Sequence, residues 1–124
     1  VQENINIVSD WLEAGCIIQL DAGSILGYLG KRAKIASLEI LKNEWCQLIG
    51  SDAHDNKSRN FYLKDAINMT NELLQKDMSK LVNENPRKIL DGEPISVDIK
   101  YKNTNISESK IHRLVRNIAR RKSL

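Results

Sequence analysis

The sequence predicts an α/β fold, namely an arc cut from a larger βα barrel, followed by a basic helix. Helical periodicity and short apolar runs alternate along the chain as helix–strand–helix–strand–helix, an order typical of parallel sheets and barrels. Only two strands are indicated, and a parallel sheet needs more neighbouring strands and two covered faces to be stable. The charge changes near the end, since residues 98–124 carry eight basic and two acidic side chains.

The first elements follow from apolar spacing and glycine. Ile5, Val8 and Leu12 recur at helical spacing, and Gly15 stands where a left-handed cap would close a helix. Residues 16–20 are short and rich in β-branched side chains, which predicts a buried strand that ends at Asp21. Residues 22–30 contain three glycines and are predicted to form a loop with one helical turn.

The second half of the chain shows the same alternation of helices and strands. We predict a helix over residues 31–45, a strand over 47–50, a helix from Phe61 to Gln75 and a short helix that starts at Asn85–Pro86. The methionines and both tryptophans fall on or beside helix faces, so we expect Met69, Met78, Trp11 and Trp45 to pack in the core.

Composition supports one globular domain. The chain has 124 residues, of which 41% are hydrophobic and 28% charged, and no apolar run is long enough to cross a bilayer. It begins at Val1 without a basic or apolar leader, so we expect no signal peptide and a fragment or a processed chain. Cys16 and Cys46 form no disulfide framework, and we expect buried reduced thiols in a cytoplasmic protein.

The tail is expected to be separate from the barrel, with residues 1–95 in the barrel and residues 96–124 in a basic, helical tail. Ser107 can cap a helix with one apolar stripe, which can lie on the barrel or bind a membrane surface, nucleic acid or an acidic partner. No aromatic residue follows Tyr101, so we expect no nucleic-acid partner.

The most informative stretch is Ser51-Asp52-Ala53-His54, which follows the second strand. Residues two apart in an extended segment point to one side, so this carboxylate and imidazole can converge on one divalent ion. The carboxyl ends of strands are also where α/β barrels place their active sites. The alternative is an aspartate that caps the next turn beside a surface histidine. No P-loop and no nucleophile elbow is present.

Several ordered motifs resemble one family. These are Gln19–Gly27, Leu48–His54 with Arg59, and Asn85–Ile95. Together they resemble the C-terminal half of the bacterial metal-dependent protein-tyrosine phosphatases of capsule and exopolysaccharide operons. That family belongs to the polymerase-and-histidinol-phosphatase (PHP) superfamily, which folds as a distorted, TIM-like βα barrel.

The resemblance implies roles for three residues. Asp52 and His54 match ligands of a cluster of divalent ions, with manganese as the expected metal, and Arg59 matches an arginine that binds the substrate phosphate. A guanidinium pairs two phosphate oxygens at once, which suits that role. Asp21 stands where the family usually has asparagine, and we expect it to cap the following loop rather than to bind metal.

The resemblance also implies that most of the family's metal ligands are missing from these residues. The family carries a D-x-H-x-H segment and further His and Glu ligands in its N-terminal half, whereas this sequence has only His54 and His112. We therefore expect the chain alone to be inactive and its open sheet edges to favour self-association.

The implied activity of the parent enzyme is hydrolysis of phosphotyrosine in a protein, with an autophosphorylated tyrosine kinase as the expected partner. One alternative is a non-catalytic module that binds a partner through the basic tail. Another is a PHP phosphoesterase with a different substrate, such as histidinol phosphate, or with a proofreading role beside a polymerase.

Overall fold

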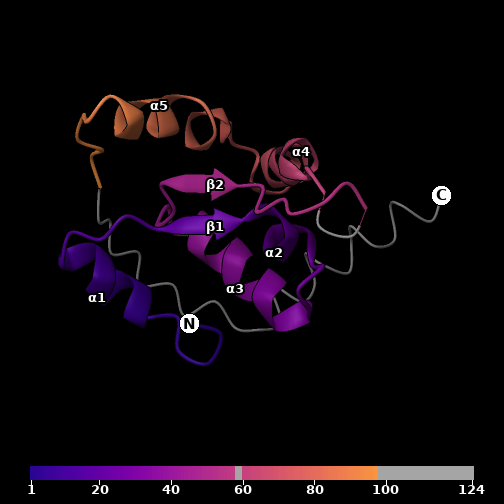
Figure 1. The fold of residues 1–124 in the computed structure, drawn as a ribbon. Coiled ribbons are helices and arrows are strands. Elements are labelled where there is room, and N and C mark those ends of the chain that lie inside the picture. The colour runs from indigo at the N-terminus through magenta and orange to yellow at the C-terminus, as the bar shows by residue number, and fades with distance from the viewer. Residues whose placement is uncertain (58–59, 98–124) are drawn as a thin grey trace.

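A computed structural model describes residues 1–57 and 60–97 of the chain. Its elements alternate as the sequence predicts, and Figure 1 shows them around a small sheet. They are α1 (Ile7–Glu13), β1 (Gln19–Asp21), α2 (Ala22–Leu26), α3 (Lys31–Lys42), β2 (Leu48–Gly50), α4 (Leu63–Leu74), the 3₁₀ turn η1 (Ser79–Leu81) and α5 (Glu84–Leu90). Arg59 and the predicted tail helix from Ser107 lie outside the described residues.

The sheet of the described part consists of β1 and β2, which run parallel. Leu20 pairs with Ile49, and Asp21 at the end of β1 pairs with Gly50 at the end of β2. Parallel strands need a crossover connection, and α2 and α3 supply it here. Both arrows in Figure 1 point the same way, so the segments that follow the two strands leave the sheet at one edge.

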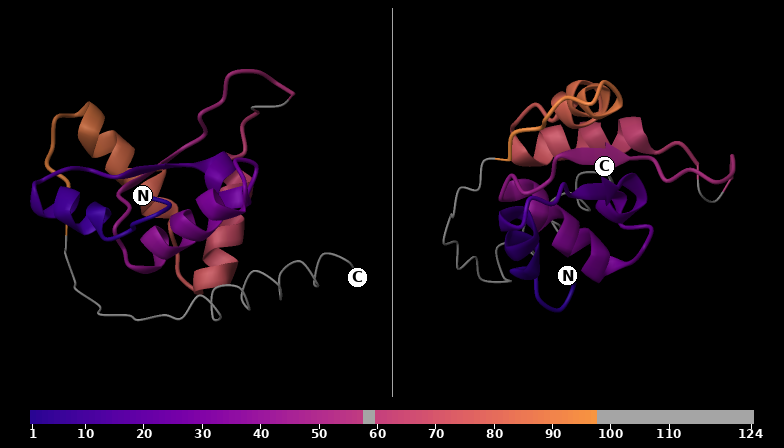
Figure 2. Two further views of the ribbon diagram at one scale, coloured as in Figure 1. Left: turned by 90° about the horizontal axis from the view of Figure 1, so that it is seen from below. Right: turned by 60° about the vertical axis from the view of Figure 1, so that its left-hand side comes forward.

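The helices lie on two sides of the strand pair. Figure 1 and the right-hand view of Figure 2 show α1 and α3 beyond β1, whereas α4 and α5 lie beyond β2. The predicted α/β architecture is therefore present as a two-stranded piece. The core joins side chains from both sides: Val8, Leu12, Ala22, Ile25, Leu38, Ile40, Leu41, Trp45, Cys46, Ile49, Ala66, Met78 and Leu81.

Gln47 connects three parts of this fold. Its side chain is buried, and its Oε1 accepts a hydrogen bond of 2.8 Å from the backbone N–H of Ile18, just before β1. Its carbonyl accepts a second bond of 2.8 Å from Nδ2 of the buried Asn85 in α5. Gln47, at the start of β2, is thus hydrogen-bonded both to the start of β1 and to α5.

The ends of the elements differ from the predicted ones by a few residues. Gly15 adopts a positive φ of 85° after α1, which confirms the predicted left-handed cap. The helix predicted over 31–45 stops at Lys42, because Glu44 turns to a positive φ of 62° and carries Trp45 out of the helix into the core. Residues 47–50 form a strand only from Leu48.

Three predictions of burial are wrong, and all fall at or beside β1. The strand itself was expected to be buried, but Gln19 is exposed and Leu20 and Asp21 are only partly buried. Cys16 is exposed, although Cys46 is buried as expected. Trp11 is 40% exposed, although Trp45 is only 7% exposed and lies in the core. The predicted strand over 16–20 also begins only at Gln19. These residues line a surface that the described part of the chain leaves uncovered.

Within residues 1–57 and 60–97, no helix combines the length and the apolarity needed to cross a membrane.

Candidate functional site

The polar residues of interest collect where both strands end. Asp21 is the last residue of β1, and Ser51 begins the loop that follows β2. Because Asp21 and Gly50 are partners in the parallel register, these two segments leave the same edge of the sheet. In α/β folds this carboxyl edge is where ligands bind.

The Asp52 and His54 side chains come together in this loop. His54 Nε2 lies 3.3 Å from Asp52 Oδ1, and the two side chains are 57% and 48% exposed for the histidine and the aspartate. The predicted convergence is present, but its predicted cause is wrong. Asp52 is not extended, since its φ of 48° is left-handed, a conformation that aspartate tolerates better than most residues.

A tyrosine pair holds the two loops at this edge against each other. The rings of Tyr28, which follows α2, and Tyr62, which precedes α4, lie 4.7 Å apart between centroids with their planes tilted by 53°. The Tyr62 hydroxyl donates a 3.3 Å hydrogen bond to the carbonyl of Lys57, in the loop that carries Asp52 and His54. The loop that carries the candidate ligands is thus tied to the loop after α2.

This tyrosine pair is not predicted by the sequence pattern. A weak signal was present, because each tyrosine lies in the segment between a predicted strand and the body of the next helix, in a chain with only 5% aromatic residues. Spacing alone does not show that residues 34 positions apart will stack.

Asp21 caps a helix, as expected. Its Oδ1 accepts a 3.0 Å hydrogen bond from the Gly23 N–H, and its Oδ2 accepts bonds of 3.1 Å and 3.3 Å from the Ser24 N–H and hydroxyl. The cap starts α2, which ends at Gly27 in a left-handed conformation with φ 98°. Both carboxylate oxygens are therefore already engaged in local structure.

The donors that remain fit part of a metal site. At metal–ligand distances of about 2.1 Å, adjacent ligand atoms around an octahedral ion lie about 3 Å apart, close to the separation of the Asp52 and His54 atoms. A carboxylate and an imidazole also suit divalent ions such as manganese. Across residues 1–57 and 60–97, no group of three or more His, Cys, Asp or Glu side chains is placed to hold an ion. Asp52 and His54 can thus supply part of a shell, and other residues must complete it.

Several known proteins are similar to this chain. The family model described as "Capsular polysaccharide synthesis, CpsB/CapC" matches residues 1–91. The tyrosine-protein phosphatase YwqE of Bacillus subtilis is 27% identical over 95 residues, which are 77% of this chain and 37% of YwqE. CapC of Staphylococcus aureus is 29% identical over 68 residues, which are 55% of this chain and 27% of CapC.

A solved structure resembles the fold as well. It comes from work on YwqE of Bacillus subtilis and CpsB of Streptococcus pneumoniae, described there as unique metal-dependent tyrosine phosphatases. The TM-score is 0.69 at 27% identity, over 77% of this chain and 38% of the solved chain. The present chain therefore spans well under half the length of the relatives it matches.

Proposed function

Because the chain belongs to the CpsB/CapC family of capsular polysaccharide synthesis, we propose that it forms part of a metal-dependent phosphatase that hydrolyses phosphotyrosine in proteins. In this proposal residues 1–95 are the C-terminal part of a PHP barrel, and residues 96–124 are a separate tail. The chain contributes one segment of the active site, and the rest of the family fold supplies the others.

The observation that carries the proposal is the exposed Asp52–His54 pair at the carboxyl edge of the sheet. The two side chains would hold a divalent ion together, with manganese as the proposed metal. Such an ion, when bound, activates water and neutralises charge on phosphate oxygens. Asp52 would add negative charge beside the ion, and His54 would bind through its neutral imidazole.

Arg59 is proposed to bind the substrate phosphate, on the strength of its sequence position alone. It follows His54 by five residues in the sequence. A guanidinium in this role would pair two phosphate oxygens and stabilise the charge that develops there. Arg59→Lys should recover only part of the activity lost in Arg59→Ala, because an ammonium keeps the charge without the two parallel donors.

The proposed substrate is an autophosphorylated tyrosine kinase that controls capsule or exopolysaccharide synthesis, and the proposed compartment is the cytoplasm. The family description and the names of the relatives support the substrate class. The free thiols of Cys16 and Cys46 support a reducing compartment.

The test is a chimera in which this chain replaces the matching residues of YwqE, assayed on a phosphotyrosine peptide with manganese. Asp52→Asn and His54→Ala should each lower activity by at least about 100-fold, the order of loss typical when catalytic charge stabilisation is removed. Metal content by elemental analysis should fall in parallel. His112→Ala is the matched control and should stay within about twofold.

A second measurement uses the 124-residue chain alone. Added Mn²⁺ should broaden the imidazole NMR signals of His54 well before those of His112, and Asp52→Asn should reduce this effect. Full activity of both chimera variants with unchanged metal, or equal broadening of the two histidines, would contradict the ligand assignment.

A further inference from the structure

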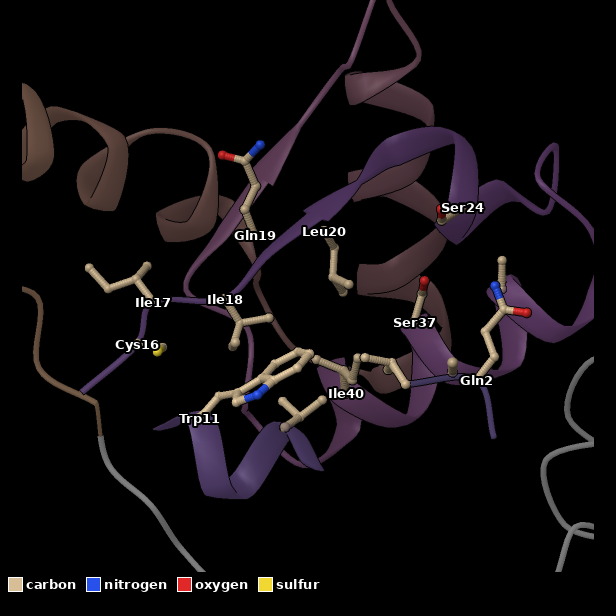
Figure 3. A pocket seen from close by; sticks show the side chains of 14 residues that line it. Gln2, Trp11, Cys16, Ile17, Ile18, Gln19, Leu20, Ser24, Ser37 and Ile40 are labelled. Carbon is tan, nitrogen blue, oxygen red and sulfur yellow. The ribbon is translucent and has the colours of Figure 1, made fainter. Parts of the chain in front are cut away.

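Exposed apolar side chains of the described residues lie both beside β1 and at the carboxyl edge of the sheet. Beside β1 is a pocket of about 530 Å³, where Figure 3 shows Trp11 and Ile40 turned toward a common space. Further strands of the proposed PHP barrel would cover that side. Tyr28, Leu29 and Phe61 form the second group, the edge patch, and they are 63%, 58% and 77% exposed.

The edge patch is built from two loops that the tyrosine pair brings together. The rings of Tyr28 and Tyr62 lie 4.7 Å apart between centroids, and Leu29 and Phe61 are their immediate neighbours in the sequence. Tyr28 stays mostly exposed despite this contact, so most of its side chain is free to contact another molecule. The three side chains of the edge patch therefore lie around one ring pair.

The remaining family fold does not explain why the edge patch is exposed. In a βα barrel, further strands pair beside the existing ones, whereas the carboxyl face stays open and holds the substrate. An apolar patch that stays open to solvent commonly marks a surface that binds another molecule. The edge patch is therefore available to a substrate that reaches the candidate metal ligands.

The edge patch lies within reach of a substrate held at Asp52 and His54. The Tyr62 hydroxyl donates a 3.3 Å hydrogen bond to the Lys57 carbonyl. Lys57 follows His54 by three residues, which span at most about 11 Å of chain. An extended polypeptide rises about 3.3 Å per residue, so residues within about three positions of a bound phosphotyrosine can reach the patch.

Basic residues follow the edge patch along the chain. Lys31 and Arg32 stand just after Leu29 at the start of α3, and both are exposed. The sequence has no acidic residue between Asp21 and Glu39. Cations in the first turn of a helix are unfavourable, because they meet the positive end of the helix dipole. Carboxylates of a ligand would offset this repulsion, so this edge favours an acidic polypeptide.

We propose that the edge patch and the start of α3 bind the substrate polypeptide on either side of its phosphotyrosine, and that they select an apolar residue next to it and an acidic residue beyond. The apolar residue would pack on the edge patch, and Lys31 and Arg32 would pair with the acidic one. This inference rests on the proposed phosphatase function for the place of the phosphate. The surface itself is separate from Asp52 and His54.

A first experiment measures peptide binding to the full 124-residue chain without turnover. The probe is the peptide Glu-Leu-phosphotyrosine-Leu-Glu, followed by the NMR signals of the Phe61 ring and the Leu29 methyl groups. A matched peptide carries serine in place of both leucines. The leucine peptide should bind at least tenfold more tightly. The unphosphorylated forms of both peptides should show the same preference, because the edge patch does not contact the phosphate.

A second experiment measures kcat/KM of the YwqE chimera on the two phosphopeptides. Phe61→Ser should lower the preference for the leucine peptide at least fivefold, with Leu29→Ser as a second variant if Phe61→Ser unfolds. Leu90→Ser is the matched control and should change the preference less than twofold. Leu90 is 85% exposed, but it belongs to α5, which Asn85 bonds to Gln47 before the start of β2, away from the carboxyl edge.

The acidic position has its own variant. Wild type should prefer the peptide with glutamates over one with lysines in their place, and Arg32→Glu should reduce this preference at least fivefold. An unchanged preference would overturn the acidic position. Inactivity of the chimera on p-nitrophenyl phosphate, which has no flanking residues, would count against the proposed function alone, and peptide binding by the 124-residue chain then decides the role of the edge patch.

Three results would overturn the role of the edge patch. One is equal binding of the leucine and serine peptides to the 124-residue chain. The second is an equal effect of Phe61→Ser and Leu90→Ser on the peptide preference. The third is a shift of the Phe61 and Leu29 signals as the chain concentration rises, with a dimer in sedimentation and no response to peptide. The occupant of the patch would then be a second copy of this chain.

Discussion

Replacing Asp21 separates its capping role from a role as a metal ligand. In the structure this carboxylate accepts bonds from two backbone N–H groups, at 3.0 Å from Gly23 and 3.1 Å from Ser24. Asp21→Ala leaves both donors at the start of α2 without their acceptor, in a part-buried setting. The variant should therefore lose stability whether or not metal is present.

The size of the loss follows from the two bonds. Removing an N-cap side chain costs about 0.5–2 kcal/mol, and loss of both partners with a negative charge at the helix start favours the upper half of that range. A loss of about 1 kcal/mol lowers the melting temperature of a domain this small by about 4–8 °C. Asp21→Asn retains one side-chain oxygen and should lose about half as much, since one net hydrogen bond contributes about 0.5–1.5 kcal/mol.

Urea unfolding followed by circular dichroism measures these free energies, and Mn²⁺ titration of the same variants measures metal binding. We expect the stability order wild type, Asp21→Asn, Asp21→Ala, with Mn²⁺ affinity unchanged throughout. Equal stability of wild type and Asp21→Ala, together with weaker Mn²⁺ binding, would refute the capping argument and make Asp21 a ligand.

Three further predictions concern the core, the thiols and acid stability. Leu41→Ala should lose about 2–5 kcal/mol in urea unfolding, because Leu41 is 1% exposed and its truncation leaves a cavity. A thiol reagent at pH 8 should modify Cys16 at once but Cys46 only on unfolding, since burial raises the pKa of Cys46 to about 12. Hydrogen bonds from the Ser79 N–H and hydroxyl lower the pKa of Asp77. The stabilising effect of the Asp77 carboxylate should therefore be present above pH 3.8, the ordinary pKa of an aspartate, and be lost as the pH falls below that value. Ser79→Ala should raise the pKa of Asp77 in an NMR titration.

Each of these predictions has a result that would count against it. A loss below about 1 kcal/mol for Leu41→Ala would mean that the core relaxes around the cavity. Equal labelling rates for the two thiols would show that Cys46 is accessible. An Asp77 pKa that does not respond to Ser79→Ala would assign its shift to another group.

The sequence was sufficient to predict the order of both strands and of the longer helices, because their apolar periodicity is clear, but it did not predict η1. It also predicted the left-handed cap at Gly15 and the capping role of Asp21, since both depend on local backbone geometry. The end of α3 was not predictable from periodicity, because Trp45 continues the apolar spacing while Glu44 has already left the helical region. Tertiary packing of the indole decides that boundary.

The candidate site was only partly predictable. The approach of His54 to Asp52 was expected, yet it depends on a left-handed turn at Asp52 that an alternating pattern does not encode. The exposure of Trp11 was missed for a different reason. An apolar residue on a helix indicates that its side chain packs against something, but the sequence pattern does not show whether the packing partner lies in this chain. The role of Arg59 stays a prediction.

The amide at Gln47 has a consequence for the order in which the chain folds. Its two hydrogen bonds close chain loops of 29 and 38 residues, so they can form only after α3 and α4 have brought distant segments together. Long loops of this kind make contacts slow to form but add little to their equilibrium cost. Once formed, the bond from Asn85 opposes separation of α5 from the sheet, because one net hydrogen bond contributes about 0.5–1.5 kcal/mol. We therefore expect α5, the last helix of the described residues, to form late in folding and to unfold together with the strands.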